Sequence, residues 1–138
     1  MITDKRLFIT GILGAKGVAL GAMCAHFLKS KVTDGTITTD QLNGFETGVK
    51  YHMLHAIVML VIVLLSKTSQ NKYFNWAFNL FFVGIFLFSG SLYFLCTRHL
   101  FGAEWLKILG PVTPIGGVCL ILGWLCLSIA SLNSVKNG

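Results

Sequence analysis

Four long apolar stretches dominate this chain, and they leave little choice of fold. They cover about residues 7–28, 48–65, 76–96 and 112–132. One helix needs about 20 mostly apolar residues to cross the hydrocarbon core of a bilayer. Apolar residues make up 54% of the 138 residues and charged residues only 12%, which excludes an ordinary soluble domain. We therefore expect an all-α, polytopic membrane protein, built as an antiparallel bundle of four transmembrane helices.

The polar segments between these stretches are short, and they predict a single membrane domain over residues 1–138. They read KSKVTDGTITTDQLN, SKTSQNK and TRHLFGAEWLK, which leaves no room for a separate soluble domain. The first apolar stretch is longer than the core of about 7 to 15 residues typical of a signal peptide, so we expect a retained helix.

The basic residues do not decide the orientation of the chain. Lysines and arginines that flank the four stretches divide evenly between the two sides, so the positive-inside rule gives no preference. The formal charge of +6 suits anionic lipid headgroups. Since the charges do not form a patch interleaved with aromatic residues, we expect membrane lipids and no nucleic acid as partners.

Four segments carry a resemblance to a known family. GAMCAHFLK, FETGVKYHMLHA, LFSGSLYFL and GPVTPIGGVCLILGW occur in this order. They resemble the successive signatures of the YgdD-like (YwdK-like) family of small four-helix membrane proteins, which has eukaryotic transmembrane relatives. The resemblance implies a multi-pass protein of the cell (inner) membrane with cytoplasmic termini, and it implies no biochemical function. It also implies that His26 and His55 occupy family positions, whereas His52 varies.

Topology gathers the polar residues at one side of the membrane. The ends of the first and third spans and the starts of the second and fourth must share one leaflet, which we call the polar leaflet. The candidate ligand-binding residues near it are His26, Tyr51, His52, His55, Ser89, Ser91, Thr113, Gly116 and Gly117.

Helical spacing sorts the residues that open the second span. At 100° per residue, His52, His55 and Met59 fall within one arc of about 80°, whereas Glu46 and Lys50 point to the opposite side. We interpret Glu46 and Lys50, spaced i and i+4, as an ion pair. The histidine face is expected to turn inward and to meet His26.

Two interpretations of the histidines stay open. They form a proton relay or a ligand site, since ionisable residues at membrane depth are commonly functional. Alternatively, they hydrogen-bond to each other or to the backbone and lock helices together. Cys24 and His26 point about 160° apart on one helix, and the chain has no CxxC or HExxH motif, so we expect neither a metal site nor another cofactor.

The TPIGG motif predicts the start of a helix. Thr113 can cap it, Pro114 fits its first turn, and Gly116 with Gly117 allow another backbone to approach closely. The same helix start also leaves N–H groups that suit a lipid headgroup or an anionic ligand.

Lys16 and the small residues of the first span lie on different faces. Lys16 sits near the centre of the span, and no Asp or Glu lies at matching depth. We expect its ammonium to bend toward water or to meet a bound lipid phosphate or a partner's carboxylate. The small-residue face predicts close helix packing, either within the bundle or between subunits. It consists of Gly11, Gly14, Val18, Gly21, Ala22 and Ala25.

These features favour a non-enzymatic accessory or scaffold protein, as a homo-oligomer or within a larger membrane complex. The alternative is a binder or carrier of a lipid-like or small anionic ligand, held in the polar leaflet by His26, His55 and the TPIGG motif. A metal-dependent or redox enzyme is not expected, because the possible ligands are scattered.

Overall fold

Every regular element of the described chain is a helix. The structure is a computed structural model that describes residues 4–69 and 71–135. The elements are α1 (Lys5–Met23), η1 (Cys24–Leu28), α2 (Lys29–Thr33), α3 (Thr39–Leu65), α4 (Lys72–Gly84), η2 (Ile85–Gly90), α5 (Ser91–Thr97), η3 (Arg98–Phe101), η4 (Glu104–Leu109) and α6 (Val112–Val135). Of these, η1 and η2 are π-helical turns, and η3 and η4 are short 3₁₀ helices.

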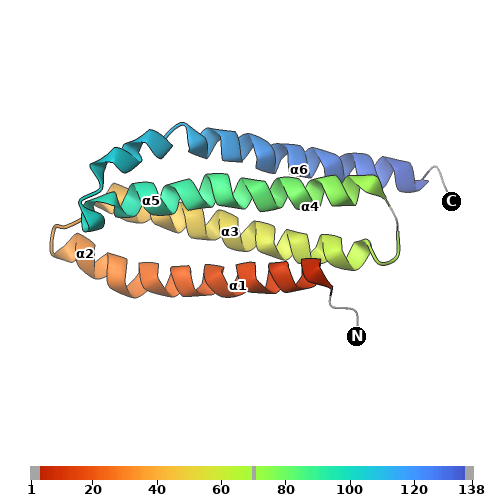
Figure 1. The fold of residues 1–138 in the computed structure, drawn as a ribbon. Helices are drawn as coiled ribbons and strands as arrows, with labels where there is room; N and C mark the ends of the chain where they lie inside the picture. The colour runs from red at the N-terminus through yellow and green to blue at the C-terminus, as the bar shows by residue number, and fades with distance from the viewer. Residues whose placement is uncertain (1–3, 70, 136–138) are drawn as a thin grey trace.

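Consecutive elements continue one another, so the chain forms four long rods. Each rod is long and apolar enough to cross a membrane, and the four cover Lys5–Thr33, Thr39–Leu65, Lys72–Phe101 and Glu104–Leu132. The rods alternate in direction, and the chain enters and leaves at the same end of the bundle (Figure 1). This confirms the prediction of an all-α membrane protein with four spanning helices.

The second rod begins well before the apolar run of about residues 48–65. Thr38 and Gln41 form a capping box: the Gln41 N–H donates to the Thr38 hydroxyl at 3.2 Å, and the Thr38 N–H donates to the Gln41 side-chain oxygen at 3.0 Å. The box fixes the start of α3, which places His52 at the midpoint of α3 (Thr39–Leu65). The first nine residues of α3, residues 39–47, therefore precede the apolar run.

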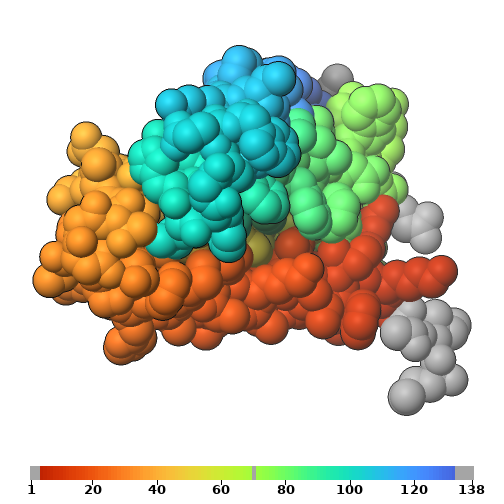
Figure 2. Space-filling view, turned by 60° about the vertical axis from the view of Figure 1, so that its left-hand side comes forward, coloured from red at the N-terminus to blue at the C-terminus, as the bar shows by residue number. Residues whose placement is uncertain are grey.

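The rods pack mainly as two hairpins. α1 packs on α3, and α4 packs on α6, while α3 also contacts α4 and α5. As a result α1 and α6 lie at opposite edges of the bundle (Figure 1). The space-filling view shows α1 and α2, in red and orange, as the lower edge of the molecule (Figure 2).

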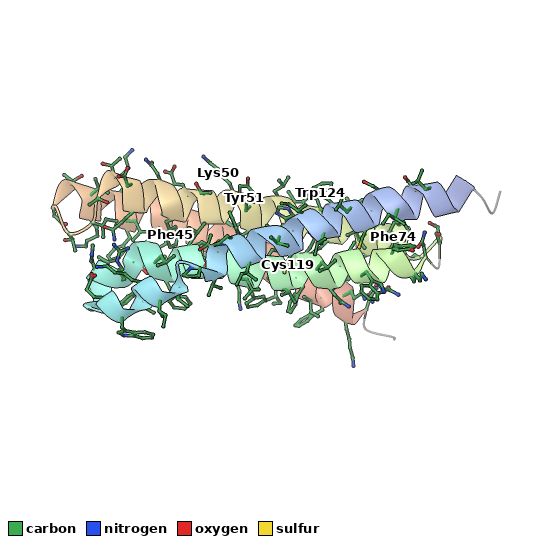
Figure 3. All side chains as sticks on the ribbon, turned by 90° about the horizontal axis from the view of Figure 1, so that it is seen from above. Phe45, Lys50, Tyr51, Phe74, Cys119 and Trp124 are labelled. Atoms are coloured by element: carbon green, nitrogen blue, oxygen red, sulfur yellow. The ribbon has the colours of Figure 1, made fainter. Side chains whose placement is uncertain are left out.

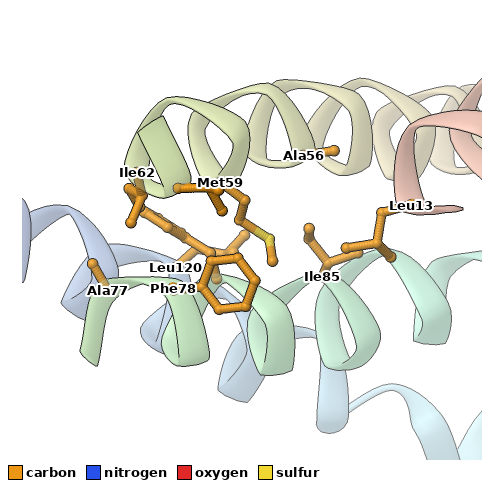
Figure 4. Packing of buried hydrophobic residues seen from close by; sticks show 10 residues of the cluster. Leu13, Ala56, Met59, Ile62, Ala77, Phe78, Ile85 and Leu120 are labelled. Carbon is orange, nitrogen blue, oxygen red and sulfur yellow. The ribbon is translucent and has the colours of Figure 1, made fainter. Parts of the chain in front are cut away.

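The main core lies between α3, α4 and α6. Met59, Ala77 and Phe81 have no exposed surface, and they pack with Phe78, Ile85 and Leu120 (Figure 4). Lipid tails are as apolar as these side chains, so close packing rather than escape from water holds them together. A second cluster around Leu28, Phe45 and Cys96 lies toward the other end of α3.

Glycines bring the last two spans unusually close. A Cβ atom on Gly116 would lie 2.7 Å from the Leu87 carbonyl carbon, and one on Gly123 would lie 2.6 Å from the Phe81 ring. Gly116 therefore seats α6 directly on the backbone of η2. Gly117 is different, because a Cβ there would meet the Phe88 ring at an ordinary 3.7 Å.

The small-residue face of α1 is used only in part within the bundle, because a Cβ on Gly21 would meet Val49 of α3 at 3.4 Å. α1 instead buries Thr10, Leu13 and Gly17 against its neighbours. A Cβ added to Gly11 or Gly14 would find nothing within 4 Å. Gly21 thus packs inside the bundle as one of the two predicted uses of this face, whereas Gly11 and Gly14 remain open.

Replacing Gly116 by alanine is expected to lower the free energy of unfolding by about 1–3 kcal/mol, because the added methyl group collides with the backbone of η2. Unfolding in mixed micelles of increasing dodecyl sulfate content measures the effect. Gly117→Ala is the matched control, and it should be neutral or slightly stabilising, since alanine is the better helix former. Equal effects of the two substitutions would contradict the close approach.

The turn between α2 and α3 contains a carboxylate with a strongly shifted pKa. The Lys31 ammonium lies 2.8 Å from the Asp34 carboxylate, and the Thr36 hydroxyl and N–H also donate to it. These donors, Lys31 first, lower the pKa of Asp34 to about 2. Because this pKa is lowered, the ionised Asp34 carboxylate stabilises the turn at pH values above its ordinary pKa of 3.8. This stabilisation is lost as the pH falls toward 2.

A ¹³C NMR titration of the full chain in micelles should therefore give an Asp34 midpoint near 2. Lys31→Gln should raise the midpoint toward the ordinary value of about 3.9. Lys29→Gln, which removes a neighbouring lysine without removing a donor to Asp34, should leave it unchanged. A wild-type midpoint close to the ordinary value would show that the turn does not hold the carboxylate.

Candidate functional site

The structure brings some of the predicted site residues into the interior and leaves others on the surface. His52, His55, Ser89, Ser91 and Gly116 are buried. Thr113 and Gly117 are half-buried, and Lys16, His26 and Tyr51 are exposed. Tyr51 on α3 and Trp124 on α6 mark the level of His55, whose ring contacts both (Figure 3).

His52 joins α3 to two other rods. Its Nε2 lies 3.0 Å from the Leu13 carbonyl oxygen on α1, and its Nδ1 lies 3.0 Å from the Tyr93 hydroxyl on α5. Because a carbonyl only accepts, Nε2 carries the proton and donates to Leu13, while Nδ1 accepts from the Tyr93 hydroxyl. The surroundings of His52 thus select the neutral Nε2–H tautomer.

His55 joins α3 to the fourth rod with the opposite arrangement. Its Nδ1 lies 2.7 Å from the Tyr51 carbonyl oxygen one turn earlier, and its Nε2 lies 3.2 Å from the indole nitrogen of Trp124 on α6. An indole N–H only donates, so Nε2 must accept and Nδ1 must carry the proton. The Phe81 ring also contacts the imidazole, with ring centroids 5.2 Å apart.

Neither buried histidine offers a free ring nitrogen. The four nitrogens of His52 and His55 each have a hydrogen-bond partner. A second proton on His55 would point at the Trp124 N–H, which cannot accept it. This geometry suits the locking of helices, and a ligand could bind a ring nitrogen only by replacing one of these hydrogen bonds.

Hydroxyl groups join the third rod to the fourth. The Ser91 hydroxyl donates to the Phe88 carbonyl at 2.9 Å, so the Thr113 hydroxyl donates to Ser91 across their 2.7 Å contact. Because α6 begins at Val112, Thr113 already lies inside its first turn, and the predicted capping role is wrong. Ser89 is buried near the Tyr93 hydroxyl, and its own hydroxyl has no partner of good geometry among the described residues.

His26 does not meet the histidine face as expected. η1 buries Cys24 and Leu28, and His26, two residues from each, lies on the exposed side of the helix. The position on α1 that faces His52 belongs to the backbone carbonyl of Leu13.

Three charged residues, Lys16, Glu46 and Lys50, lack ion-pair partners among the described residues. None of the ion pairs formed by residues 4–69 and 71–135 includes Lys16, Glu46 or Lys50. The predicted pair between Glu46 and Lys50 is thus not formed, although both side chains are exposed on α3. Over the same residues, no group of three or more His, Cys, Asp and Glu side chains has the geometry to hold a metal ion.

The sequence did not single out the partners of the buried histidines. The spacing of residues within one span points to neither Tyr93 nor Trp124, and no sequence signal marks the Leu13 carbonyl. A signal that could have found Tyr93 and Trp124 does exist. Each carries a hydrogen-bond donor in its side chain and lies on another span at the same level as an inward-facing histidine.

A polar network that the sequence analysis missed braces the connection before α6. The His99 ring lies 3.1 Å from the Gln41 side-chain oxygen through Nδ1 and 2.6 Å from the Glu104 carboxylate through Nε2. Lys107 also pairs with Glu104, at 2.5 Å. This network ties the start of α3 to η3 and η4.

¹⁵N NMR of the side chains near pH 7 should detect two neutral histidines of opposite tautomer, with the proton on Nε2 of His52 and on Nδ1 of His55. Trp124→Phe should abolish the defined state of His55 and cost about 1 kcal/mol of stability, as expected for one hydrogen bond between membrane helices.

Trp76→Phe is the matched control for this experiment, because Trp76 is 64% exposed. It should leave both imidazole spectra unchanged. The same tautomer at both positions, or a charged His55, would contradict the geometry.

Comparison with known proteins identifies relatives along nearly the whole chain. Residues 20–117 match the family described as "Protein of unknown function (DUF423)". A UPF0382 membrane protein of Staphylococcus epidermidis is 43% identical, covering 93% of this chain and 96% of the relative. YwdK of Bacillus subtilis, also named a UPF0382 membrane protein, is 38% identical over 93% of this chain and 97% of its own.

A more distant relative is YgdD of Escherichia coli, named a UPF0382 inner membrane protein. It is 30% identical, and the match covers 100% of this chain and 97% of the length of YgdD. No solved structure matches. The resemblance seen in the four sequence segments is confirmed, and the chain belongs to the DUF423 (UPF0382) family of membrane proteins.

Proposed function

We propose that this protein is a non-enzymatic accessory or scaffold protein that associates sideways with other membrane-spanning helices. The observation that carries the proposal is the open small-residue face of α1, where a Cβ on Gly11 or Gly14 would find no neighbour within 4 Å. Small residues at matching heights let helix backbones approach closely in lipid, where packing drives association.

The closed histidine cluster also supports a structural role. His52 and His55 form hydrogen bonds to the other three rods through their ring nitrogens. The most polar part of the interior therefore stabilises the bundle. A catalytic acid or base needs a side chain within reach of a substrate. These imidazoles are buried and committed to other partners.

The alternative function, a binder or carrier of a lipid-like or small anionic ligand, has less support. It required His26, His55 and the TPIGG motif to share one site. His26 is exposed on η1, and Gly116 packs directly on the backbone of η2. The Gly116 side of the first turns of α6 is thus occupied by protein.

We further propose the inner (cell) membrane as the location, with both termini in the cytoplasm. The name of the Escherichia coli relative contains the words inner membrane protein. The start of α1 and the end of α6 lie at the same end of the bundle, as an even number of spans requires (Figure 1).

The proposal is tested by counting chains in native membrane discs. The tagged full-length protein is extracted with a polymer, without detergent, and weighed by native mass spectrometry. Discs that contain this chain should contain at least one further polypeptide. Gly14→Phe, which fills the open face of α1, should convert them to discs with a single chain.

Ala19→Phe is the matched control, because Ala19 is exposed on the other flank of the same helix. It should leave the assembly intact. Wild-type discs that hold only one 138-residue chain would overturn the proposal.

A further inference from the structure

A groove runs along α1 and α3 on the outside of the bundle. One end holds a hollow of about 350 Å³ lined by Leu7, Thr10, Gly11, Gly14, Met53, Ala56, Ile57 and Leu60. The other end holds a hollow of about 150 Å³ lined by Gly21, Cys24, Ala25, Glu46, Val49 and Lys50. Each hollow lies between the same two helices, and the lining residues follow one another turn by turn.

The α1 side of this groove has the spacing of a helix-packing seam. Gly11, Gly14, Val18, Gly21 and Ala25 alternate steps of three and four residues. Such a repeat keeps one edge of a helix against a neighbour that runs nearly parallel to it. Since the residues are small, a helix lying in the groove can approach both α1 and the flank of α3.

Two opposite charges lie at the narrow end of the groove. Glu46 and Lys50 line the smaller hollow, both are exposed, and neither forms an ion pair with residues 4–69 or 71–135. They lie six and two residues from the midpoint of α3 at His52, which is about 9 and 3 Å along the axis. Lys50 lies at the start of the apolar run of about residues 48–65 and Glu46 lies just before it, so both face lipid near the polar leaflet, where an unpaired charge is costly.

We infer that the groove between α1 and α3 is the interface of a parallel homodimer, in which Glu46 of each chain pairs with Lys50 of the other. This inference rests on the proposed function and names the occupant of the open face. Identical chains insert in the same direction, so a two-fold axis along the membrane normal places equal residues at equal depth. Both opposite charges then find partners in the second copy.

Other occupants match the groove less well. The headgroup of an anionic lipid neutralises Lys50 and leaves the Glu46 carboxylate unpaired. An apolar helix matches neither charge. A second copy of this chain supplies an acid and a base at the required depth, and it supplies its own seam of small residues to face the first.

Cysteine cross-linking in membranes tests the contact directly. Val18→Cys, at the middle of the seam, should form a disulfide-linked dimer on mild oxidation. Ile121→Cys is the matched control, because Val18 is 62% exposed and Ile121 on α6 is 61% exposed. The control should form no more dimer than wild-type protein, whose four native cysteines set the background.

Charge reversal tests the pairing within the Val18→Cys background. Glu46→Lys and Lys50→Glu should each lower the dimer association constant about 30-fold, because each breaks both pairs of the two-fold dimer at roughly 1 kcal/mol a pair. Co-expression of the two variants should restore cross-linking between unlike chains, since one carries two positive charges and the other two negative ones. A pair within one chain predicts no such rescue, because each variant chain carries only like charges.

Different results overturn different statements. If Val18→Cys cross-links no more than Ile121→Cys, or if co-expression gives no rescue, the homodimer is wrong. If the native discs then contain a different polypeptide, the homodimer is wrong and the proposed accessory function stands. The same holds if the discs contain several chains but only lipid lies in the groove. If the discs contain only single chains, both fail.

Discussion

The hydrogen bonds of two histidines make α3 the helix to which every other rod is attached. His52 binds a backbone carbonyl of α1 and the Tyr93 hydroxyl of the third rod, and His55 binds Trp124 of the fourth. Lipid cannot satisfy a polar group, so each of these bonds favours the assembled bundle over separated helices. Apolar packing between α4 and α6 then fills the space that the bonds define.

The sequence predicted the rods well and their contacts poorly. Long apolar runs fix four spans, and helical spacing puts His52 and His55 on one inward face, because both signals depend on residues close together in the chain. The hydrogen-bond partners of these histidines could not be predicted in this way. The partner of His52 on α1 is a backbone carbonyl, which has no sequence signature, and the expected partner His26 is turned outward by η1.

The glycines and the π-helical turns also show that contacts between rods are harder to predict than the rods themselves. The GG of TPIGG predicted a close approach, and the structure assigns that approach to Gly116 alone, against the backbone of η2. Nothing in the local sequence distinguishes it from Gly117, because the difference arises from the position of another rod. The π-helical turn of η2 likewise rotates the chain so that Ser89 and Ser91 both lie inside the bundle.

The pairing of α1 with α3, and of α4 with α6, also governs how the chain can be built. Each pair consists of consecutive spans, so a complete helical hairpin leaves the ribosome before the next one starts. Contacts between neighbours in sequence close short loops and form quickly. The bonds of His52 to Tyr93 and of His55 to Trp124 then join two finished hairpins. The order of synthesis is therefore also the order in which each span acquires its main neighbour.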